Sequence, residues 1–485
     1  LHSQGPYLAA KTEDKEPRYF LDAASQIATL GLGFNSYVFM GTGQFLESWT
    51  NNSRGKDFQA IVKAYREFFR RKLEWDNVFL SFCHSGAEAN EIALGHCYHE
   101  RENRKAKKIL CFEGSFHGRM LLSLFSTANK KKREPFQWPG FESTFAPFPE
   151  MREDDDGEIN PPSPEGWAEF WDAAPRKDFK IPDFWPNDQL LQRETDALMS
   201  IRESLLTGEH FAIIIEPMQC EGGDRYASGR FHSALLLMAK AFNVPLIYDE
   251  VQTGFHLGRE FFWHKQLELQ GLNGEKLEPS FVTCAKKAQV GLVLSPESPK
   301  KESEKKLHEG EFQVGSVIRG HLHALSLDQS KAKILSIEQK TTQRLKALAE
   351  KHFDLIENPR ANGLALAFDL KDPTKLQEVI QSRFAHGLLY YPAGSKTLRF
   401  RMNLAFSDRD LDFLFQQLEK ILLEVYRGKT PELPEVVETK TRYTQEILEW
   451  QHKLIKLKFK RWQHEEVNNQ EYRAYIDSVF KQTLG

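Results

Sequence analysis

Between residues 77 and 294, short apolar segments alternate with segments of helical periodicity, and this alternation constrains the fold most strongly. The apolar segments are rich in Ile, Val and Phe along their whole length, which is typical of a mainly parallel sheet covered by helices on both faces. We therefore predict an α/β fold. The expected strands are residues 78–82, 108–112, 212–215, 246–248, 281–283 and 291–294, and the expected helices include 59–72, 87–101 and 230–242.

The rest of the sequence predicts a second, smaller α+β domain and several surface segments. Residues 150–186 are rich in acids, prolines and tryptophans, which indicates a surface insertion, whereas the Pro/Lys/Glu-rich residues 295–311 indicate an exposed loop. After residue 331 we expect a long helix, strands at 364–368 and 399–401, and a helix at 408–426. The expected division is an N-terminal segment (1–40) that contributes to the small domain, a large domain (41–315) with an insertion at about 150–190, a small domain (316–429) and a helical tail (430–485).

The tail combines apolar residues at helical spacing with a basic stretch. Ile447, Trp450, Leu454 and Leu457 recur with that spacing, and lysines cluster around them. An amphipathic helix with a solvated face explains this pattern better than a contact with a partner or with nucleic acid.

Composition narrows the class of protein. A chain of 485 residues is too long for one ordinary hydrophobic core and should divide into two or more domains. Its net charge of -3 gives no overall electrostatic attraction to nucleic acid. Five cysteines without a CxxC pair favour free thiols in a reducing compartment over disulfides or a metal site. No apolar run approaches the roughly 18 residues that span a bilayer, and no secretory signal is evident. We expect a cytoplasmic protein that contacts neither membrane, metal nor nucleic acid.

Two motifs follow the first expected strands. Ser85-Gly86-Ala87 opens a helix, whose free N–H groups and positive dipole suit a phosphate, although Ser-Gly is also an ordinary helix cap. Phe116-His117-Gly118-Arg119 supplies an aromatic ring that can stack on a heterocycle and an arginine that can bind a carboxylate. Taken singly, each motif is explained better by an ordinary role, a helix cap for the first and a core Phe with a surface Arg for the second.

Two later motifs carry charged side chains. Glu216-Pro217 and Glu221-Gly222-Gly223-Asp224 leave another strand end, where a flexible loop can present a carboxylate to a ligand or form a solvated turn. Arg399 and Arg401 are two residues apart on an expected strand and so share one face. They either point toward a site or form surface ion pairs.

Asp249 and Lys286 end two successive apolar strands and form the most informative pair. An acid that holds a ring nitrogen protonated and an amine that bonds to an aldehyde suit a pyridoxal phosphate enzyme. The phosphate loop, aromatic residue, acid and lysine all fall at strand ends, on the rim of a parallel sheet where ligands bind.

Together these motifs make the chain resemble the class III, fold-type I pyridoxal phosphate aminotransferases, from about residue 5 to residue 426. The resemblance implies a large domain with a seven-stranded, mainly parallel sheet and a smaller α+β domain. Within the class the chain looks most like the lysine ε-aminotransferases, through Ala285-Lys286-Lys287-Ala288-Gln289-Val290, the residues Phe136-Gln137-Trp138-Pro139, and Arg399-Phe400-Arg401 after Pro392-Ala393-Gly394.

The resemblance also implies roles for individual residues around the cofactor. Lys286 would form the covalent link to pyridoxal 5'-phosphate, in preference to Lys287, because the motif places the lysine directly after the small residue. Asp249 would pair with the ring nitrogen. The other residues that would contact the cofactor are Ser85, Gly86 and Ala87 at the phosphate, Phe116 and Val251 on the ring faces, Gln252 near the phenolate oxygen, and His117, Glu216 and Ser316.

For the substrates, the resemblance implies that Arg399 takes the α-carboxylate of glutamate and that Glu221 neutralises Arg399 when an ω-amine binds. Arg119 would hold the distal carboxylate of 2-oxoglutarate or the α-carboxylate of lysine. We expect a ping-pong transfer of the terminal amino group of L-lysine to 2-oxoglutarate, giving 2-aminoadipate semialdehyde and glutamate. The alternatives are a γ-aminobutyrate or ornithine donor, a pyridoxal phosphate mutase or epimerase, and a non-catalytic relative.

Two departures from the family pattern bear on substrate geometry. The family's Thr and its nearby Gly-Gly-Asn, which clamp the phosphate from the partner subunit of a homodimer, correspond to residues 314–320 here, where Ser316 is the available hydroxyl. The family's Pro-Pro after the arginine strand is Met402-Asn403. The tail beyond residue 430 lies outside the family pattern.

Overall fold

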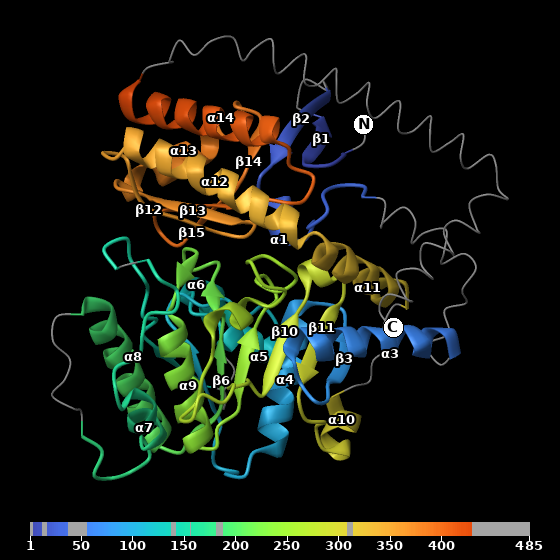
Figure 1. The fold of residues 1–485 in the computed structure, drawn as a ribbon, viewed down its shortest axis with the longest axis vertical. Helices are drawn as coiled ribbons and strands as arrows, with labels where there is room; N and C mark the ends of the chain where they lie inside the picture. Colours follow the sequence, from blue (N-terminus) through green and yellow to red (C-terminus); the bar gives the residue numbers. More distant parts are fainter. Residues whose placement is uncertain are drawn as a thin grey trace.

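The computed structural model describes residues 3–11, 17–36, 56–136, 142–155, 157–180, 188–307 and 314–428. The expected tail helix and part of the 150–190 insertion lie outside the described residues. Figure 1 shows a large lobe built around one sheet and, above it, a smaller lobe drawn in orange. The α/β fold class is confirmed, whereas the four-part division at residues 41, 316 and 430 stays a prediction.

A seven-stranded sheet forms the centre of the large lobe. Its neighbouring strands run parallel except β11, which is antiparallel to both β10 and β3. In spatial order the strands are β3 (Phe79–Cys83), β11 (Gly291–Ser295), β10 (Phe281–Cys284), β9 (Leu246–Asp249), β6 (His210–Ile215), β4 (Lys108–Phe112) and β5 (Glu142–Ala146). The parallel strands therefore deliver their carboxyl ends to one rim, where ligands bind in such sheets.

Helices and short hairpin strands surround this sheet. The cap of α4 is typical, since the Ser85 hydroxyl accepts a hydrogen bond from the Glu88 N–H and the helix begins at Gly86. The described helices of this region are α3 (Lys56–Leu73), α4 (Gly86–Glu100), α5 (Leu121–Phe125), α6 (Lys130–Arg133), α7 (Trp167–Asp172), α8 (Gln189–Leu206), α9 (Gly229–Ala241) and α10 (Lys301–Leu307). A hairpin of β7 (Met218–Gln219) and β8 (Arg225–Tyr226) follows β6.

The small lobe is an antiparallel sheet with helices packed beside it. The sheet order is β12 (Ile356–Asn362), β13 (Ala365–Leu370), β16 (Thr397–Arg401) and β15 (Tyr391–Ala393). The helices from residue 314 onward are α11 (Val314–Gln329), α12 (Lys331–Lys351), α13 (Leu376–Ser382) and α14 (Asp408–Arg427). The N-terminal strands β1 (Tyr7–Lys11) and β2 (Pro17–Asp22) join this lobe, because β2 pairs in parallel with β14 (Leu388–Leu389).

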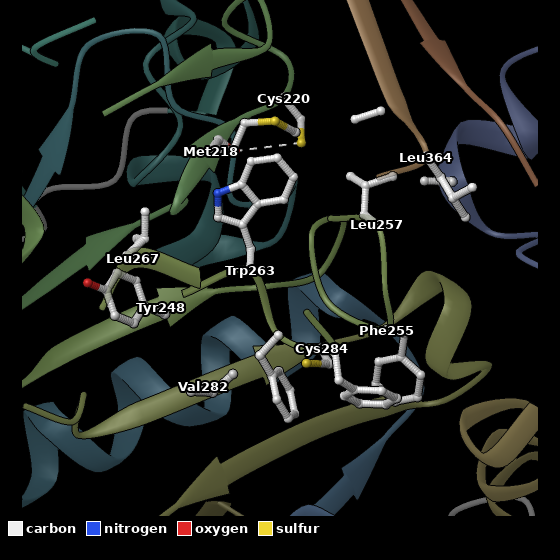
Figure 2. Packing of buried hydrophobic residues seen from close by; sticks show 14 of the residues in the cluster. Met218, Cys220, Tyr248, Phe255, Leu257, Trp263, Leu267, Val282, Cys284 and Leu364 are labelled. Atoms are coloured by element: carbon white, nitrogen blue, oxygen red, sulfur yellow. Dashed lines mark hydrogen bonds between the residues drawn. The ribbon is translucent and has the colours of Figure 1, made fainter. Parts of the chain in front are cut away.

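One buried core connects the two lobes. Figure 2 shows the indole of Trp263 beside Met218 and Cys220. The Cys220 thiol donates a hydrogen bond to the Met218 carbonyl at 3.6 Å. On the small-lobe side, Leu364 packs near Leu257, and the Leu364 N–H donates to the Leu257 carbonyl at 2.7 Å. The strand ends that carry the candidate site thus rest on a continuous apolar support.

The structure corrects the expectation for residues 295–311 and contains strands that were not predicted, among them β5 and β12. Residues 295–311 are not simply an exposed loop: they contain α10, whose Leu307 packs so closely on α4 that a Cβ at Gly95 would lie 2.8 Å from the Leu307 Cδ2. Ser303 of the same helix is buried against His96, with 2.7 Å between its hydroxyl and the His96 Nδ1. The strand β5 was not predicted, because this edge strand is only half-buried and lacks a continuous apolar run. Among the described residues, no helix is long and apolar enough to cross a membrane.

Candidate active site

Asp249 lies at the end of β9 and is 4% exposed. Its Oδ2 accepts a hydrogen bond from the Asn90 amide and lies 2.8 Å from the His117 Nδ1, while its Oδ1 accepts from the Val251 N–H at 3.0 Å. Thr283 in turn donates to the Asn90 Oδ1 at 2.6 Å. Groups from α4, from the loop after β4 and from β10 therefore fix the Asp249 carboxylate in one orientation. Asn90 and Thr283 are not among the residues predicted for the site from the sequence.

Lys286 follows β10 and has a φ of 51°, in the left-handed region that residues other than glycine rarely adopt. Its Nζ donates to the Ile27 carbonyl at 3.2 Å. Burial lowers the pKa of the Lys286 amine to about 8, and the positive charges of Arg399 and Arg401 act in the same direction. A larger fraction of this amine is therefore neutral near pH 7 than of a surface lysine.

Lys287 is 2% exposed, and its amine contacts a different carbonyl from the one that Lys286 contacts. Its Nζ donates to the Gln252 carbonyl at 2.9 Å, and burial lowers its pKa to about 7. Both neighbouring amines are therefore perturbed. Their hydrogen-bond partners differ, because Lys286 donates to the Ile27 carbonyl and Lys287 donates to the Gln252 carbonyl.

The N-terminus of α4 comes close to Val251. A Cβ built on Gly86 would lie 2.5 Å from the Val251 Cγ1, so only glycine permits this approach. The first N–H groups of a helix have no acceptor within the helix, and together with the helix dipole they favour an anion. This part of the site suits a phosphate next to an apolar side chain.

Glu216 joins two loops at the sheet rim. Its Oε1 accepts from the Phe116 N–H at 2.9 Å and its Oε2 accepts from the Cys220 N–H at 3.1 Å. Burial, together with the neighbouring Asp249 charge, raises the pKa of the Glu216 carboxyl to about 8. Glu216 therefore positions the Phe116 backbone from beneath the site.

Arg399, Glu221 and Lys132 form a charged cluster at the edge of the site. The Arg399 Nη2 donates to the Glu221 Oε2 at 2.8 Å, and the Lys132 Nζ donates to the Glu221 Oε1 at 3.1 Å. Burial raises the pKa of the Glu221 carboxyl, but Arg399 and Lys132 outweigh burial and the net pKa is lowered. The Arg399 Nη1 is buried without a hydrogen-bond partner among the described residues, so this guanidinium can donate hydrogen bonds to a further carboxylate.

Arg401 is buried in a separate ion pair behind this cluster. Its Nη1 and Nη2 donate to the two oxygens of Asp224 at 2.5 and 2.6 Å, and its Nε donates to the Gln252 Oε1 at 3.0 Å. Arg399 and Arg401 thus share one face of β16 and both reach the turn at residues 220–224. Of the two arginines, Arg399 retains the unpaired nitrogen.

Two residues of the predicted site, Arg119 and Ser316, take no part in the hydrogen bonds and ion pairs described above. Arg119 is exposed and forms no hydrogen bond or ion pair within the described ranges. Ser316 lies in the first turn of α11, directly after residues 308–313, which the structure does not describe. The roles of both remain predictions. Where side chains are described, no three His, Cys, Asp or Glu residues gather as a metal site would require.

The residues present fit pyridoxal phosphate. Asp249 supplies a buried, oriented carboxylate, Lys286 an amine with a lowered pKa, and Gly86 a helix N-terminus that another side chain would obstruct. These are the groups that such a cofactor needs at its ring nitrogen, its aldehyde carbon and its phosphate.

Comparison with known proteins agrees with this geometry. Residues 5–422 match the family described as Aminotransferase class-III. The 4-aminobutyrate aminotransferase of Dictyostelium discoideum is 25% identical over 471 residues, covering 88% of this chain and 85% of that protein. The L-lysine-epsilon aminotransferase of Mycobacterium tuberculosis is 25% identical over 422 residues, covering 81% and 85%. The mitochondrial acetylornithine aminotransferase of Debaryomyces hansenii is 26% identical over 73% of this chain and 66% of its own length.

Solved structures share the fold. The lysine aminotransferase of M. tuberculosis superposes with a TM-score of 0.70 at 23% identity, covering 87% of this chain and 94% of that one. An omega-transferase from Vibrio fluvialis superposes with a TM-score of 0.68 at 17% identity, covering 88% and 98%.

Proposed function

The chain belongs to the class-III aminotransferase family and is a pyridoxal phosphate-dependent transaminase, and we propose that it moves the terminal amino group of L-lysine to 2-oxoglutarate by a ping-pong mechanism. The products would be 2-aminoadipate semialdehyde and glutamate. The observation that carries the proposal is the Glu221–Arg399 pair, in which a buried guanidinium keeps one nitrogen unpaired. Such a pair suits an enzyme that must accept both an ω-amine and an α-amino dicarboxylate.

The cofactor, when bound, supplies an electron sink that stabilises negative charge on the carbon beside the transferred nitrogen. Asp249 would keep the ring nitrogen protonated, and the amine of Lys286 would move the proton at the reacting carbon. Phe116 and Val251 would cover the ring faces and exclude water. The remaining cofactor contacts that we propose come from Ser85, Gly86, Ala87, His117, Glu216, Gln252 and Ser316.

The two half-reactions place different demands on Arg399. The terminal carbon of lysine carries no carboxylate, so Glu221 would stay on Arg399 while Arg119 binds the distant α-carboxylate. Glutamate and 2-oxoglutarate bring a carboxylate next to the reacting carbon, and this carboxylate would take the place of Glu221. A buried arginine left without either partner would be costly, which explains why the pairing acid must be able to exchange.

A γ-aminobutyrate donor is the second candidate, because the 4-aminobutyrate and lysine enzymes are equally similar to this chain at 25% identity. Ornithine is a related option. The test is a panel of L-lysine, γ-aminobutyrate and L-ornithine, each with 2-oxoglutarate, with release of glutamate and of the donor aldehyde measured. Lysine should have the highest kcat/KM, and Lys286→Ala should abolish turnover. A higher kcat/KM with another donor would reject lysine while retaining the transaminase.

We also propose a homodimer in which Ser316 reaches the partner's cofactor phosphate. Light scattering on the eluting protein should then give twice the chain mass of 56.1 kDa. A monomer with full activity would contradict the shared site.

A further inference from the structure

The Glu221 carboxylate bridges two cations that belong to distant parts of the chain. Arg399 lies on β16, Lys132 lies on α6, and each binds a different oxygen of Glu221, at 2.8 and 3.1 Å. The three side chains differ in exposure: Arg399 is 7% exposed, Lys132 27% and Glu221 41%. The acid thus lies between a buried cation and a partly solvated one.

Contacts with neighbouring residues hold the Lys132 amine within ion-pair distance of Glu221. Its Nζ lies 4.6 Å from the centroid of the Phe116 ring, a cation–π distance. The next residue, Arg133, packs over Phe145 at 4.5 Å, and the Asn129 side chain accepts from the Lys132 N–H at the start of α6. Lys132 is therefore positioned by its neighbours and is unlike an ordinary solvated lysine of a basic run.

A carboxylate that leaves Arg399 needs another cation nearby. Lys132 already touches the second oxygen of Glu221, so the acid can release Arg399 by a side-chain rotation that keeps one ion pair. Without the Lys132 charge, Glu221 would hold Arg399 more tightly, since no cation would compete for it. An incoming substrate carboxylate would then have to displace a stronger pair.

We propose that Lys132 is a positioning residue that holds Glu221 when a substrate carboxylate occupies Arg399, and that it thereby raises the affinity for dicarboxylic substrates. The inference rests on the proposed function, because it assumes that Arg399 binds a substrate carboxylate. It assigns to Lys132 no direct contact with the substrate.

The test is the binding of glutarate, an unreactive five-carbon dicarboxylate, to the cofactor-loaded protein by calorimetry. Lys132→Met should raise the Kd about tenfold, whereas Lys132→Arg, which keeps the charge, should stay within threefold of wild type. Lys131→Met is the matched control, since Lys131 is exposed on the same short helix, and it should leave the Kd unchanged. In a Glu221→Gln background, Lys132→Met should change the Kd less than twofold, because the acid that Lys132 holds is gone.

Three outcomes would overturn the proposal. An unchanged Kd in Lys132→Met would show that Lys132 does not act on the exchange. A tenfold loss that persists beside Glu221→Gln would show that Lys132 contacts the substrate itself. A wild-type protein that does not bind glutarate would remove the premise that a dicarboxylate reaches Arg399. The donor panel tests the lysine reaction separately, so a failure there leaves the glutarate result interpretable.

Discussion

Replacing Asp224 with Asn should destabilise the protein strongly, because Asp224 is fully buried and binds both terminal nitrogens of the 2%-exposed Arg401. Removing one partner of a buried ion pair leaves an uncompensated charge and costs about 3–5 kcal/mol. Asn retains one acceptor oxygen, so we expect a loss near the lower end, about 3 kcal/mol. Asp224 has a φ of 50°, a conformation that Asn tolerates well, so the backbone contributes little to the loss.

Urea unfolding monitored by tryptophan fluorescence measures this loss as a lower midpoint at an unchanged slope. Asp178→Asn is the matched control, because its ion pair with Arg176 is 70% and 66% exposed, and it should change stability by less than about 0.5 kcal/mol. In the double variant Asp224→Asn/Arg401→Met the buried charge is gone, so at least about 2 kcal/mol should return. A loss below about 1 kcal/mol in Asp224→Asn, or no recovery in the double variant, would refute the reasoning.

Three further predictions follow from the site. Gly86→Ala should cost about 1–3 kcal/mol and weaken cofactor binding, because its Cβ meets Val251; unfolding and cofactor titration measure both effects, and adding Val251→Ala should relieve them. The rate at which pyridoxal phosphate bonds to the protein should rise with pH and level off above about pH 8, where Lys286 is neutral; a rise continuing to pH 10 would contradict the lowered pKa. The folded protein retains the Glu216 proton up to about pH 8, whereas the unfolded chain releases it near pH 4.5. Wild type should therefore lose stability relative to Glu216→Gln as the pH rises through that interval, and parallel curves would reject the assignment.

The sequence predicts the elements whose signal is local. The strand that ends in Asp249 and the strand that precedes Lys286 are buried along their whole length and mostly apolar, because both faces of the sheet are covered, and this pattern can be read without tertiary information. The edge strand β5 was not predicted, since it is only half-buried and begins with three polar residues, Glu142, Ser143 and Thr144. Similarly, α10 is rich in Lys and Glu, and only its contacts with α4 distinguish it from a solvated loop.

The residues of the candidate site also fall into those that the sequence predicts and those that it does not. Residues that follow strand ends, such as Asp249 and Phe116, could be predicted because the topology of a parallel sheet brings those ends together. Lys132 could not, because a run of basic residues usually marks a solvated surface and its partner Glu221 lies 89 positions away. Asn90 was not predicted either, because its hydrogen bond to Asp249 depends on how α4 packs against β9.

Borohydride reduction of the protein loaded with pyridoxal phosphate, followed by peptide mass spectrometry, determines which amine carries the cofactor. Our account predicts one phosphopyridoxyl group per chain on Lys286, none on Lys287, and loss of this label in Lys286→Ala. The matched variant Lys287→Ala should still be labelled at Lys286. A label on Lys287, or labelling spread over exposed lysines without saturation at one per chain, would contradict the assignment of Lys286 as the catalytic residue.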